Sequence, residues 1–483
     1  MQFYIRSYLL MLSFFLTVSF YANAQVDTAK IFSIKDLQEA VLTNHPIVKQ
    51  AYLLKDAAQT RIKQALGKFD PKLESSFARK QFGNNDYYSN WQNELKVPLW
   101  LAGADLKLSY DKNYGEYTNP QYYTGRDGLG GLGLNIPIGQ GLIIDERRNT
   151  LKQAKTMARY ADADQVKQIL TVWFDAVKDY WNWYYTYQQY VLIKEGVQLA
   201  DVRYNAIVKQ AVLGDKPAID SVEAFIMVQD RKIQLTKLEV ELQNASIVLS
   251  NYLWGEDNSP VELPSYAVPQ SPDSTYNELE RVKLGSLMEY ALNSHPEILK
   301  LNAKGEQYDL EQAFRKEMLK PKVDISGSLL TRRNTFGDYN PGQYDFRWEN
   351  YKVGVNVVFP LFLRAERGKL EEARIKRKEV DYDLFQMNRN INNTITTSYN
   401  MLVGYKRQLL QQDQNLQNQQ LLLTAELQKY ELGESTLFLI NNRETKLIDM
   451  KVKKEDLLSS YQKKIAEIYY KAGTMQDSEI PKM

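Results

Sequence analysis

The second half of this 483-residue chain repeats the motifs of its first half in the same order. The matching segments are Thr43-Asn44-His45-Pro46 with Asn293-Ser294-His295-Pro296, Pro71-Lys72 with Pro321-Lys322, and Leu213-Gly214 with Leu432-Gly433. The first two pairs are 250 positions apart and the third is 219 apart, so the first copy contains 31 additional residues after Pro71. A period this long is too large for a solenoid of small units and indicates a duplicated fold.

Residues 1–24 have the features of a secretory signal peptide. Arg6 supplies the positive charge, residues 9–20 form a short apolar stretch, and Ala22-Asn23-Ala24 provides the small-residue cleavage pattern. A retained membrane anchor is disfavoured because the apolar stretch is short and the cleavage pattern follows at once. No later segment approaches the ~18 apolar residues of a membrane-spanning helix. The sequence thus leaves a periplasmic or secreted soluble protein, or an outer-membrane barrel.

The composition excludes several chemistries. The sequence has no cysteine, so it forms no disulfide, thiolate metal site or cysteine nucleophile. The net charge is only +2, which gives no argument for a nucleic-acid partner. The only histidines, His45 and His295, precede prolines at equivalent positions, so we interpret them as capping or packing residues. No motif of an enzyme, a metal site or a cofactor is visible.

In each copy, a helix is predicted to lead into extended chain at a proline. Ser33 is the expected N-cap of the first helix, and Asp36 completes a start that resembles a capping box. This helix is expected to continue to Phe69 and to stop before Pro71, and its counterpart is expected to stop before Pro321. Proline lacks a donor and disfavours helix in the preceding residue, so it suits a change to strand.

After each proline the sequence alternates between apolar and polar residues, over about residues 72–137 in the first copy and 322–360 in the second. The clearest case alternates Tyr351, Val353, Val355, Val357 and Phe359 with Lys352, Gly354 and Asn356. Trp91–Trp100 and Ala104–Asp111 predict an extra hairpin in the first copy. Strands of this kind have one apolar and one polar face.

Taken alone, these strands suit a soluble β-sandwich. Two short hairpins in a repeat are too few for a sandwich, however, and leave open edges that need partners. Other copies of the chain supply these partners if they close a barrel, in which no edge remains. The pattern therefore favours a barrel completed by several subunits.

Two long helices are predicted to follow the strands in each copy. Apolar residues recur every three or four positions over residues 166–190 and, in the second copy, over 395–430, as in the seam of a coiled coil. A helix over residues 151–212 would measure ~90 Å at ~1.5 Å per residue. Short turns near residues 213–217 and 432–436 reverse the direction of the chain, so each copy carries an antiparallel helical hairpin.

The two turns have matching residues. Gly214 and Gly433 fit the position just after a helix end, where positive φ is common. Asp215 and Ser435 are the candidate N-caps of the returning helices. A proline-rich segment separates the two copies. The predicted organisation is a signal peptide over 1–24, repeat 1 over 25–253, a linker over 254–285, repeat 2 over 286–472 and a tail over 473–483.

This order of parts resembles the TolC family of outer-membrane efflux proteins, from about Phe32 to Ala472. The resemblance implies an α+β fold in which a homotrimer completes one membrane β-barrel, continued by a long antiparallel α-helical coiled-coil tunnel in the periplasm. It also implies a passive export channel in contact with outer-membrane lipid. Its implied partners are a periplasmic adaptor (membrane fusion) protein and an inner-membrane pump, and it implies no enzyme activity, cofactor or nucleic acid.

The resemblance also assigns roles to residues near the coil tips. The tips correspond to the adaptor-docking surface of the family, which maps onto Leu213, Gly214, Leu432, Gly433 and Ser435. Asp220 lies six residues after one tip glycine, and Tyr430 lies three before the other, where the family has residues of a closed-state latch. We hypothesise that Asp220 and Tyr430 hydrogen-bond between neighbouring coils and hold the entrance shut.

The chain departs from the family pattern at two places. The family often has two aspartates six and nine residues after the second tip glycine, where this chain has Leu439 and Asn442, so an acidic ring is not expected there. Glu223, nine residues after Gly214, either supplies acidity instead or faces solvent. The segment from Trp91 to Asp111 exceeds the usual pattern, and the sequence leaves open whether it adds barrel strands.

An alternative function is that of a periplasmic coiled-coil adaptor or structural protein that never enters a membrane. Adaptors also carry helical hairpins, but normally one in each chain, together with lipoyl-like or barrel domains. This chain has two hairpins with strands inside each copy. The sequence therefore favours the outer-membrane channel of a tripartite export system.

Overall fold

The computed structural model describes residues 30–124, 127–272, 276, 278–331 and 346–476. The predicted signal peptide and the last seven residues of the predicted tail lie outside the described residues. The chain forms two compact units. Within the described residues, the sheet unit consists of Lys49–Thr171, Lys283–Thr397 and 469–476, and the tip unit consists of 30–48, Val172–Val282 and Ser398–Ile468. Each unit thus combines segments of both sequence repeats.

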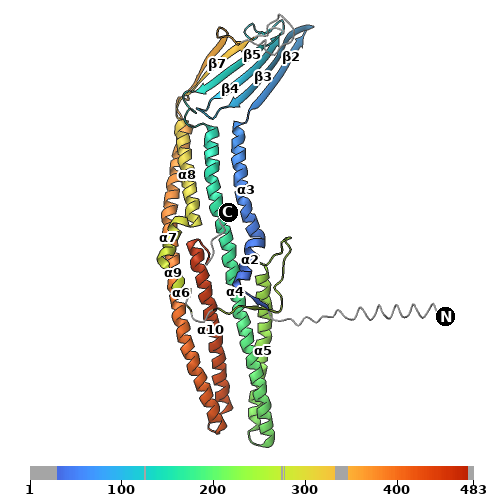
Figure 1. Cartoon of the computed structure of the whole chain (residues 1–483), viewed down its shortest axis with the longest axis vertical. Helices are drawn as coiled ribbons and strands as arrows, with labels where there is room; N and C mark the ends of the chain where they lie inside the picture. Colours follow the sequence, from blue (N-terminus) through green and yellow to red (C-terminus); the bar gives the residue numbers. More distant parts are fainter. Residues whose placement is uncertain (1–29, 125–126, 273–275, 277, 332–345, 477–483) are drawn as a thin grey trace, which may run out of the picture. The chain divides into compact units, whose positions relative to one another are not determined.

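The sheet unit contains a six-stranded sheet in which all neighbouring strands are antiparallel (Figure 1). The strands are β2 (Lys72–Phe82), β3 (Asn85–Pro98), β4 (Asp105–Tyr114), β5 (Leu129–Pro137), β7 (Lys322–Thr331) and β8 (Tyr351–Val358). Their order is β2-β3-β4-β5-β7-β8, so the two repeats meet where β5 pairs with β7. The hairpin predicted in the first copy is confirmed, because it forms β3 and β4.

The strand register gives the sheet one apolar and one polar face. Directly opposed residues in neighbouring strands share a face. One such row, which crosses all six strands, is Leu73, Leu95, Leu108, Leu132, Leu329 and Tyr351. The adjacent row, on the other face, is Lys72, Lys96, Lys107, Gly133, Ser328 and Lys352. The alternation predicted from single strands is therefore in phase across the whole sheet.

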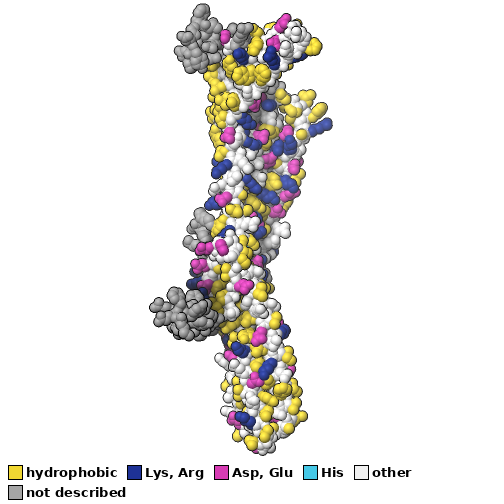
Figure 2. Space-filling model, turned by 90° about the vertical axis from the view of Figure 1, so that its right-hand side faces the viewer, with side chains coloured by type: hydrophobic (Ala, Val, Ile, Leu, Met, Phe, Trp, Pro, Cys, Tyr) yellow, Lys and Arg dark blue, Asp and Glu magenta, His cyan; other side chains and the backbone are white. Residues whose placement is uncertain are grey.

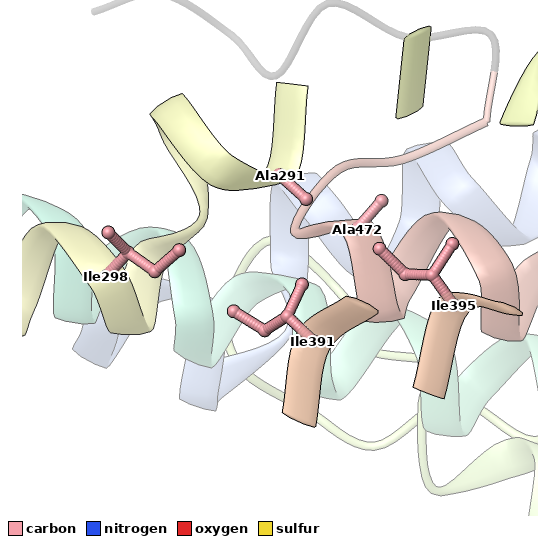
Figure 3. Close-up of a cluster of buried hydrophobic side chains, with 5 residues drawn as sticks. All are labelled: Ala291, Ile298, Ile391, Ile395 and Ala472. Atoms are coloured by element: carbon pink, nitrogen blue, oxygen red, sulfur yellow. The ribbon is translucent and has the colours of Figure 1, made fainter. Parts of the chain in front are cut away.

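Helices continue from the sheet within the same unit. They are α3 (Pro46–Leu66) with the 3-10 turn Gly67–Phe69, α7 (Leu284–Ser294), α8 (Pro296–Glu317), and parts of α4 (Glu146–Leu213) and α9 (Arg364–Glu431). One core cluster joins α7, α8, α9 and the end of α10 (Leu437–Ala472) through Ala291, Ile298, Ile391, Ile395 and Ala472 (Figure 3). Ala291, Ile395 and Ala472 are fully buried.

The prediction of one unbroken helix from Ser33 to Phe69 is wrong. The chain breaks at His45, which has extended backbone angles between α2 (Ile34–Asn44) and α3. Pro46 explains the break, because its ring excludes helical geometry at the preceding residue and it has no N–H to donate. The second copy breaks in the same way at His295, between α7 and α8.

The tip unit contains α2, α5 (Ala218–Ser250), α6 (Glu278–Arg281), the larger parts of α4 and α10, and the C-terminal half of α9. Ser33 and Asp36 form the predicted capping box of α2, which is confirmed. A short parallel pair joins β1 (Lys30–Phe32) to β6 (Ala267–Pro269). The predicted linker over 254–285 thus includes β6 and α6 as well as turns.

The long helices follow the predicted seam. In the tip unit, the buried residues of α9 are spaced by three, four or seven positions, as in a heptad seam: Ser398, Leu402, Leu409, Gln412, Gln419 and Leu423. α4 and α9 each contain 68 residues. Among the described residues, no helix is both long and apolar enough to cross a membrane.

Candidate functional site

The two hairpin tips of the tip unit have the same backbone structure. Gly214 and Gly433 have φ of +84° and +78°, a conformation that side chains disfavour. At each tip the glycine N–H and the following N–H donate to carbonyls three and five residues back, those of Ala211 and Gln210 at one tip and of Tyr430 and Lys429 at the other. This is the Schellman ending, which satisfies the last carbonyls of a helix. The glycine positions predicted from the sequence are confirmed.

The predicted N-caps of the returning helices are wrong. Pro217 occupies the N-cap of α5 and offers no side-chain acceptor, so Asp215 has no capping role. At the other tip the Thr436 hydroxyl accepts from the Leu439 N–H at 3.4 Å, whereas the Ser435 hydroxyl donates to Glu426 of α9. The Schellman turn extends each connection, and the helix therefore starts later than the sequence suggested.

Apolar side chains are exposed at both tips. Leu213 and Leu432 occupy equivalent positions, and each is 75% exposed. Phe438 and Ile219, in the first turns of α10 and α5, are also exposed. Figure 2 shows hydrophobic side chains on the surface near this end of the helices. Exposed apolar groups that gather in one region are typical of surfaces that bind another protein.

Tyr430 lies between the two hairpins. Its ring packs against one cluster formed by Ile207, Ala224 and Leu437 and against a second formed by Leu423, Ile440 and Leu447. The Lys216 Nζ lies 4.2 Å from the ring centroid, a favourable cation–π arrangement. The Tyr430 hydroxyl is buried and has no hydrogen-bond partner among the described residues. Within that part of one chain, no hydrogen bond joins it to Asp220, which is half-buried on α5.

A groove of about 870 Å³ is lined by α5 and α10 and by Gln412 and Asn415 of α9. Glu223 and Asn442, both singled out from the sequence, line it together with Asp230, Asp449 and Lys446. The Glu223 carboxylate accepts a long hydrogen bond of 3.5 Å from the Asn441 amide. Leu439 lies on the same helix turn as Asn442 but outside the groove lining. Glu223 is therefore one of several acidic groups along the groove.

Beside this groove, three helices meet at a buried ionic network that the sequence did not predict. Arg203 of α4 donates both terminal nitrogens to the Glu444 carboxylate of α10, at 2.6 and 3.1 Å, and also donates to the Asn441 side chain. Arg231 of α5 is only 3% exposed and approaches Glu444 at 3.6 Å. Burial lowers the pKa of Arg231, and its Nε and Nη2 have no hydrogen-bond partner among the described residues.

Two sequence signals point to this network. Arg231 and Glu444 occupy seam positions, because Val228 and Leu238 flank the first and Ile440 and Leu447 flank the second at seam spacing. Gly196 in the middle of α4 is the other signal. A Cβ there would lie 2.6 Å from Arg231 Nη1, so the glycine makes room for the guanidinium. A charged seam residue opposite a helical glycine thus marks a buried ion pair.

The two histidines are helix caps, as predicted. The His45 Nδ1 accepts from the Ile47 N–H at 3.2 Å, and the His295 Nδ1 accepts from the Glu297 N–H at 3.1 Å. Burial lowers the pKa of both imidazoles, which keeps them neutral and able to accept. Among the described residues, no group of three or more His, Cys, Asp or Glu side chains is placed to hold a metal ion.

Comparison with known proteins identifies the fold. No protein-family model matches the sequence, and no curated protein matches it significantly. Solved structures do match. CusC, described as forming a transmembrane channel, is 16% identical, with a TM-score of 0.67 over 94% of this chain and 96% of its own. The outer membrane protein VceC from Vibrio cholerae is 16% identical, with a TM-score of 0.62 over 92% of this chain and 96% of its own.

A third match is the open state of the MtrE outer membrane channel from Neisseria gonorrhoeae. It is 11% identical, with a TM-score of 0.64 over 91% of this chain and 89% of its own. The chain therefore has the fold of outer-membrane channels. The fold expected from the resemblance to the TolC family is confirmed at this level.

Proposed function

We propose that this chain is the outer-membrane channel of an export system and works as a homotrimer. Three sheet units close one membrane β-barrel, and the helical hairpins of the three chains form a tunnel in the periplasm. An inner-membrane pump delivers substrates through a periplasmic adaptor, and they pass through the channel passively. The chain itself catalyses no reaction, and lipid surrounds its barrel.

The observation that carries this proposal is the amphipathic sheet with two open edges. Lipid has no hydrogen-bonding groups, so a sheet that enters it must be closed. Strands of 8 to 14 residues suit a tilted crossing of the ~30 Å hydrocarbon layer. A periplasmic adaptor or structural protein that never enters a membrane would have no use for the apolar face. The solved structures with this fold add support.

A second surface favours assembly of several copies. On α5, apolar residues recur every seven positions and are more than half exposed: Ile219, Ile226, Ile233, Val240 and Ile247. A seven-residue apolar stripe specifies a coiled-coil seam. The side of α5 opposite this stripe already packs within the chain, through Ala224, Val228 and Leu238. A helix with two seams bridges two neighbours, as a tunnel wall requires.

The tips are proposed to dock the adaptor. Each tip presents an exposed leucine followed by a glycine with positive φ, and Ser435 lies beside the second tip. These residues are Leu213 with Gly214 and Leu432 with Gly433. Residues within nine positions of the tip glycines are proposed to form the entrance. Asp220 and Tyr430 form the latch. Glu223, Leu439 and Asn442 are the other residues of the entrance. Because Leu439 and Asn442 are uncharged, Glu223 is the acidic group among these last three residues.

Fractionation and mass measurement test the proposal. We expect the chain in the outer-membrane fraction, soluble only with detergent, and a native mass of three chains. Ile233→Asp should lower recovery of the trimer at least several-fold, whereas Gln234→Asp, which adds the same charge on the next face of α5, should not. A monomer that is water-soluble without detergent would overturn the proposal.

A further inference from the structure

The hairpin formed by β3 and β4 lies inside the sheet and is not an appendage. β3 pairs with β2 along nearly its whole length, with one register shift between Lys80 and Gln81. It pairs with β4 from Ser89 to Pro98, and β4 pairs with β5 from Asp105 to Asp111. Removing this hairpin would therefore separate β2 from the rest of the sheet.

Both faces of the sheet continue through this hairpin. Leu95 and Leu108 lie in the apolar row between Leu73 and Leu132. On the polar face, Lys107 forms an ion pair with Glu94 at 2.8 Å, and Lys96 forms one with Asp105 at 3.1 Å. β3 and β4 thus carry the lipid-facing and water-facing residues that a barrel strand requires.

The two edge strands of the sheet, β2 and β8, suit each other in direction and in the apolar face that they expose. Six strands that alternate in direction place β2 and β8 antiparallel, so β8 of one chain can continue into β2 of the next. At these edges the apolar face remains exposed, with Leu73 at 73% and Val353 at 64%. Because the two edges differ, such pairing is head-to-tail, and a ring closes it.

We propose that every chain contributes all six strands to the barrel, so that three chains form an eighteen-stranded barrel. This inference rests on the proposed function. The hairpin β3–β4 then widens the pore instead of folding over it. With strands ~4.8 Å apart and tilted by ~40°, the backbone radius is about 18 Å for eighteen strands and about 12 Å for twelve. The wider barrel leaves a water-filled lumen, as in barrels of 16 to 18 strands.

Spin labels measure this radius directly. The chain has no cysteine, so a single introduced cysteine is the only labelling site. Ser76→Cys on β2 and Gln92→Cys on β3 both lie on the polar face and are exposed. In a three-fold ring, equivalent labels are separated by √3 times the radius of the ring that the labels form. Backbone atoms would be separated by about 31 Å for eighteen strands and about 21 Å for twelve. Labels on the polar face point into the lumen, so both distances are shorter, but the difference of about 10 Å between the two barrels remains. Pulsed electron spin resonance of the trimer in lipid should give the longer distance at both sites.

A deletion variant supplies the matched control. Replacing residues 83–128 with a two-residue turn removes β3 and β4 and leaves β2 antiparallel to β5, with Ser76→Cys still present. We expect its label distance to shorten by about 10 Å, to the twelve-strand value. A label distance that the deletion leaves unchanged would overturn the eighteen-stranded barrel and leave the export channel intact. A monomer in native mass measurement would overturn the proposed function, and this inference with it.

Discussion

Single residues set where the helices of this protein begin and end. The capping box of Ser33 and Asp36 and the tip glycines Gly214 and Gly433 were predictable, because each depends on bonds within a few residues. The caps assigned to Asp215 and Ser435 were wrong, because the length of the tip turn decides which residue precedes the helix. Local chemistry is readable from the sequence, whereas the exact helix start depends on the geometry of the turn.

The histidine caps predict a pH dependence of stability. His45 is 5% exposed, stacks on Tyr252 and accepts the Ile47 N–H, which requires neutral imidazole. Burial lowers the pKa of His45 and of His295 below the ordinary value of about 6.5. The unfolded chain therefore binds these protons first, so the stabilisation is complete above pH ~6.5 and is lost as the pH falls through the folded pKa.

Replacement with asparagine isolates this effect, because asparagine caps a helix without titrating. In urea unfolding in detergent between pH 7.5 and 5, the double variant His45→Asn, His295→Asn should lose less stability than the unchanged chain. The expected difference is on the order of 1 kcal/mol, since one pKa unit corresponds to ~1.4 kcal/mol. If the free energy of unfolding falls equally with pH in the two proteins, the protonation of the imidazoles does not change on unfolding.

At the scale of elements, the seams were predictable and their polar members were not. The seam of α9 was expected from its leucines, whereas no role was predicted for its glutamines. In the structure, Gln412 and Gln419 donate to the carbonyls of Met450 and Arg443 on α10. Both pairs are seven residues apart, so the two bonds specify the same antiparallel register. Sequence periodicity cannot distinguish a buried amide with a partner across the seam from an exposed one.

The ionic network among α4, α5 and α10 predicts different effects on stability when Glu444 or Arg231 is replaced. Glu444 is the single buried anion near Arg203 and Arg231 among the described residues, so Glu444→Gln removes the carboxylate that both cations share and should cost about 3 kcal/mol. Arg231→Met removes a buried cation with two unpaired nitrogens and leaves Arg203 and Glu444 bound to each other. It should be neutral or stabilising.

Urea midpoints monitored by helical circular dichroism measure both variants. Gly196→Ala adds an internal check, because the new methyl group meets Arg231 Nη1. It should destabilise the unchanged chain more than the Arg231→Met variant, in which the guanidinium no longer opposes the helix propensity of alanine and only Ile448 Cδ1, 3.1 Å from the new Cβ, must shift. Equal destabilisation by Glu444→Gln and Arg231→Met would contradict this account of the network.

At the scale of the whole molecule, the fold was predictable and the site only in part. Repeat offsets, prolines and period changes place the strands and hairpins, because they reflect patterns within one chain. The groove beside Glu223 and the packing of Tyr430 require the distance between helices that are far apart in sequence. The proposed latch is even harder to predict from the sequence, because its two residues belong to neighbouring chains of the proposed trimer.

Tyr430 gives the sharpest test of that latch. Its hydroxyl is buried without a partner among the described residues, and an unpaired buried hydroxyl typically costs about 1–3 kcal/mol. If this hydroxyl donates a hydrogen bond to the Asp220 carboxylate of a neighbouring chain, the cost is removed and the entrance is held shut. Tyr430→Phe deletes only the hydroxyl, so the ring packing and the Lys216 contact should persist.

In planar lipid bilayers, Tyr430→Phe and Asp220→Ala should therefore raise the closed-state conductance at least several-fold, and their combination should add little to either. Tyr204→Phe is the matched control, since Tyr204 packs against the same cluster of Ile207, Ala224 and Leu437. If conductance stays unchanged in both latch variants while the trimer stays intact, the entrance is held by apolar packing alone. The exposed leucines of the tips would then be the next residues to test.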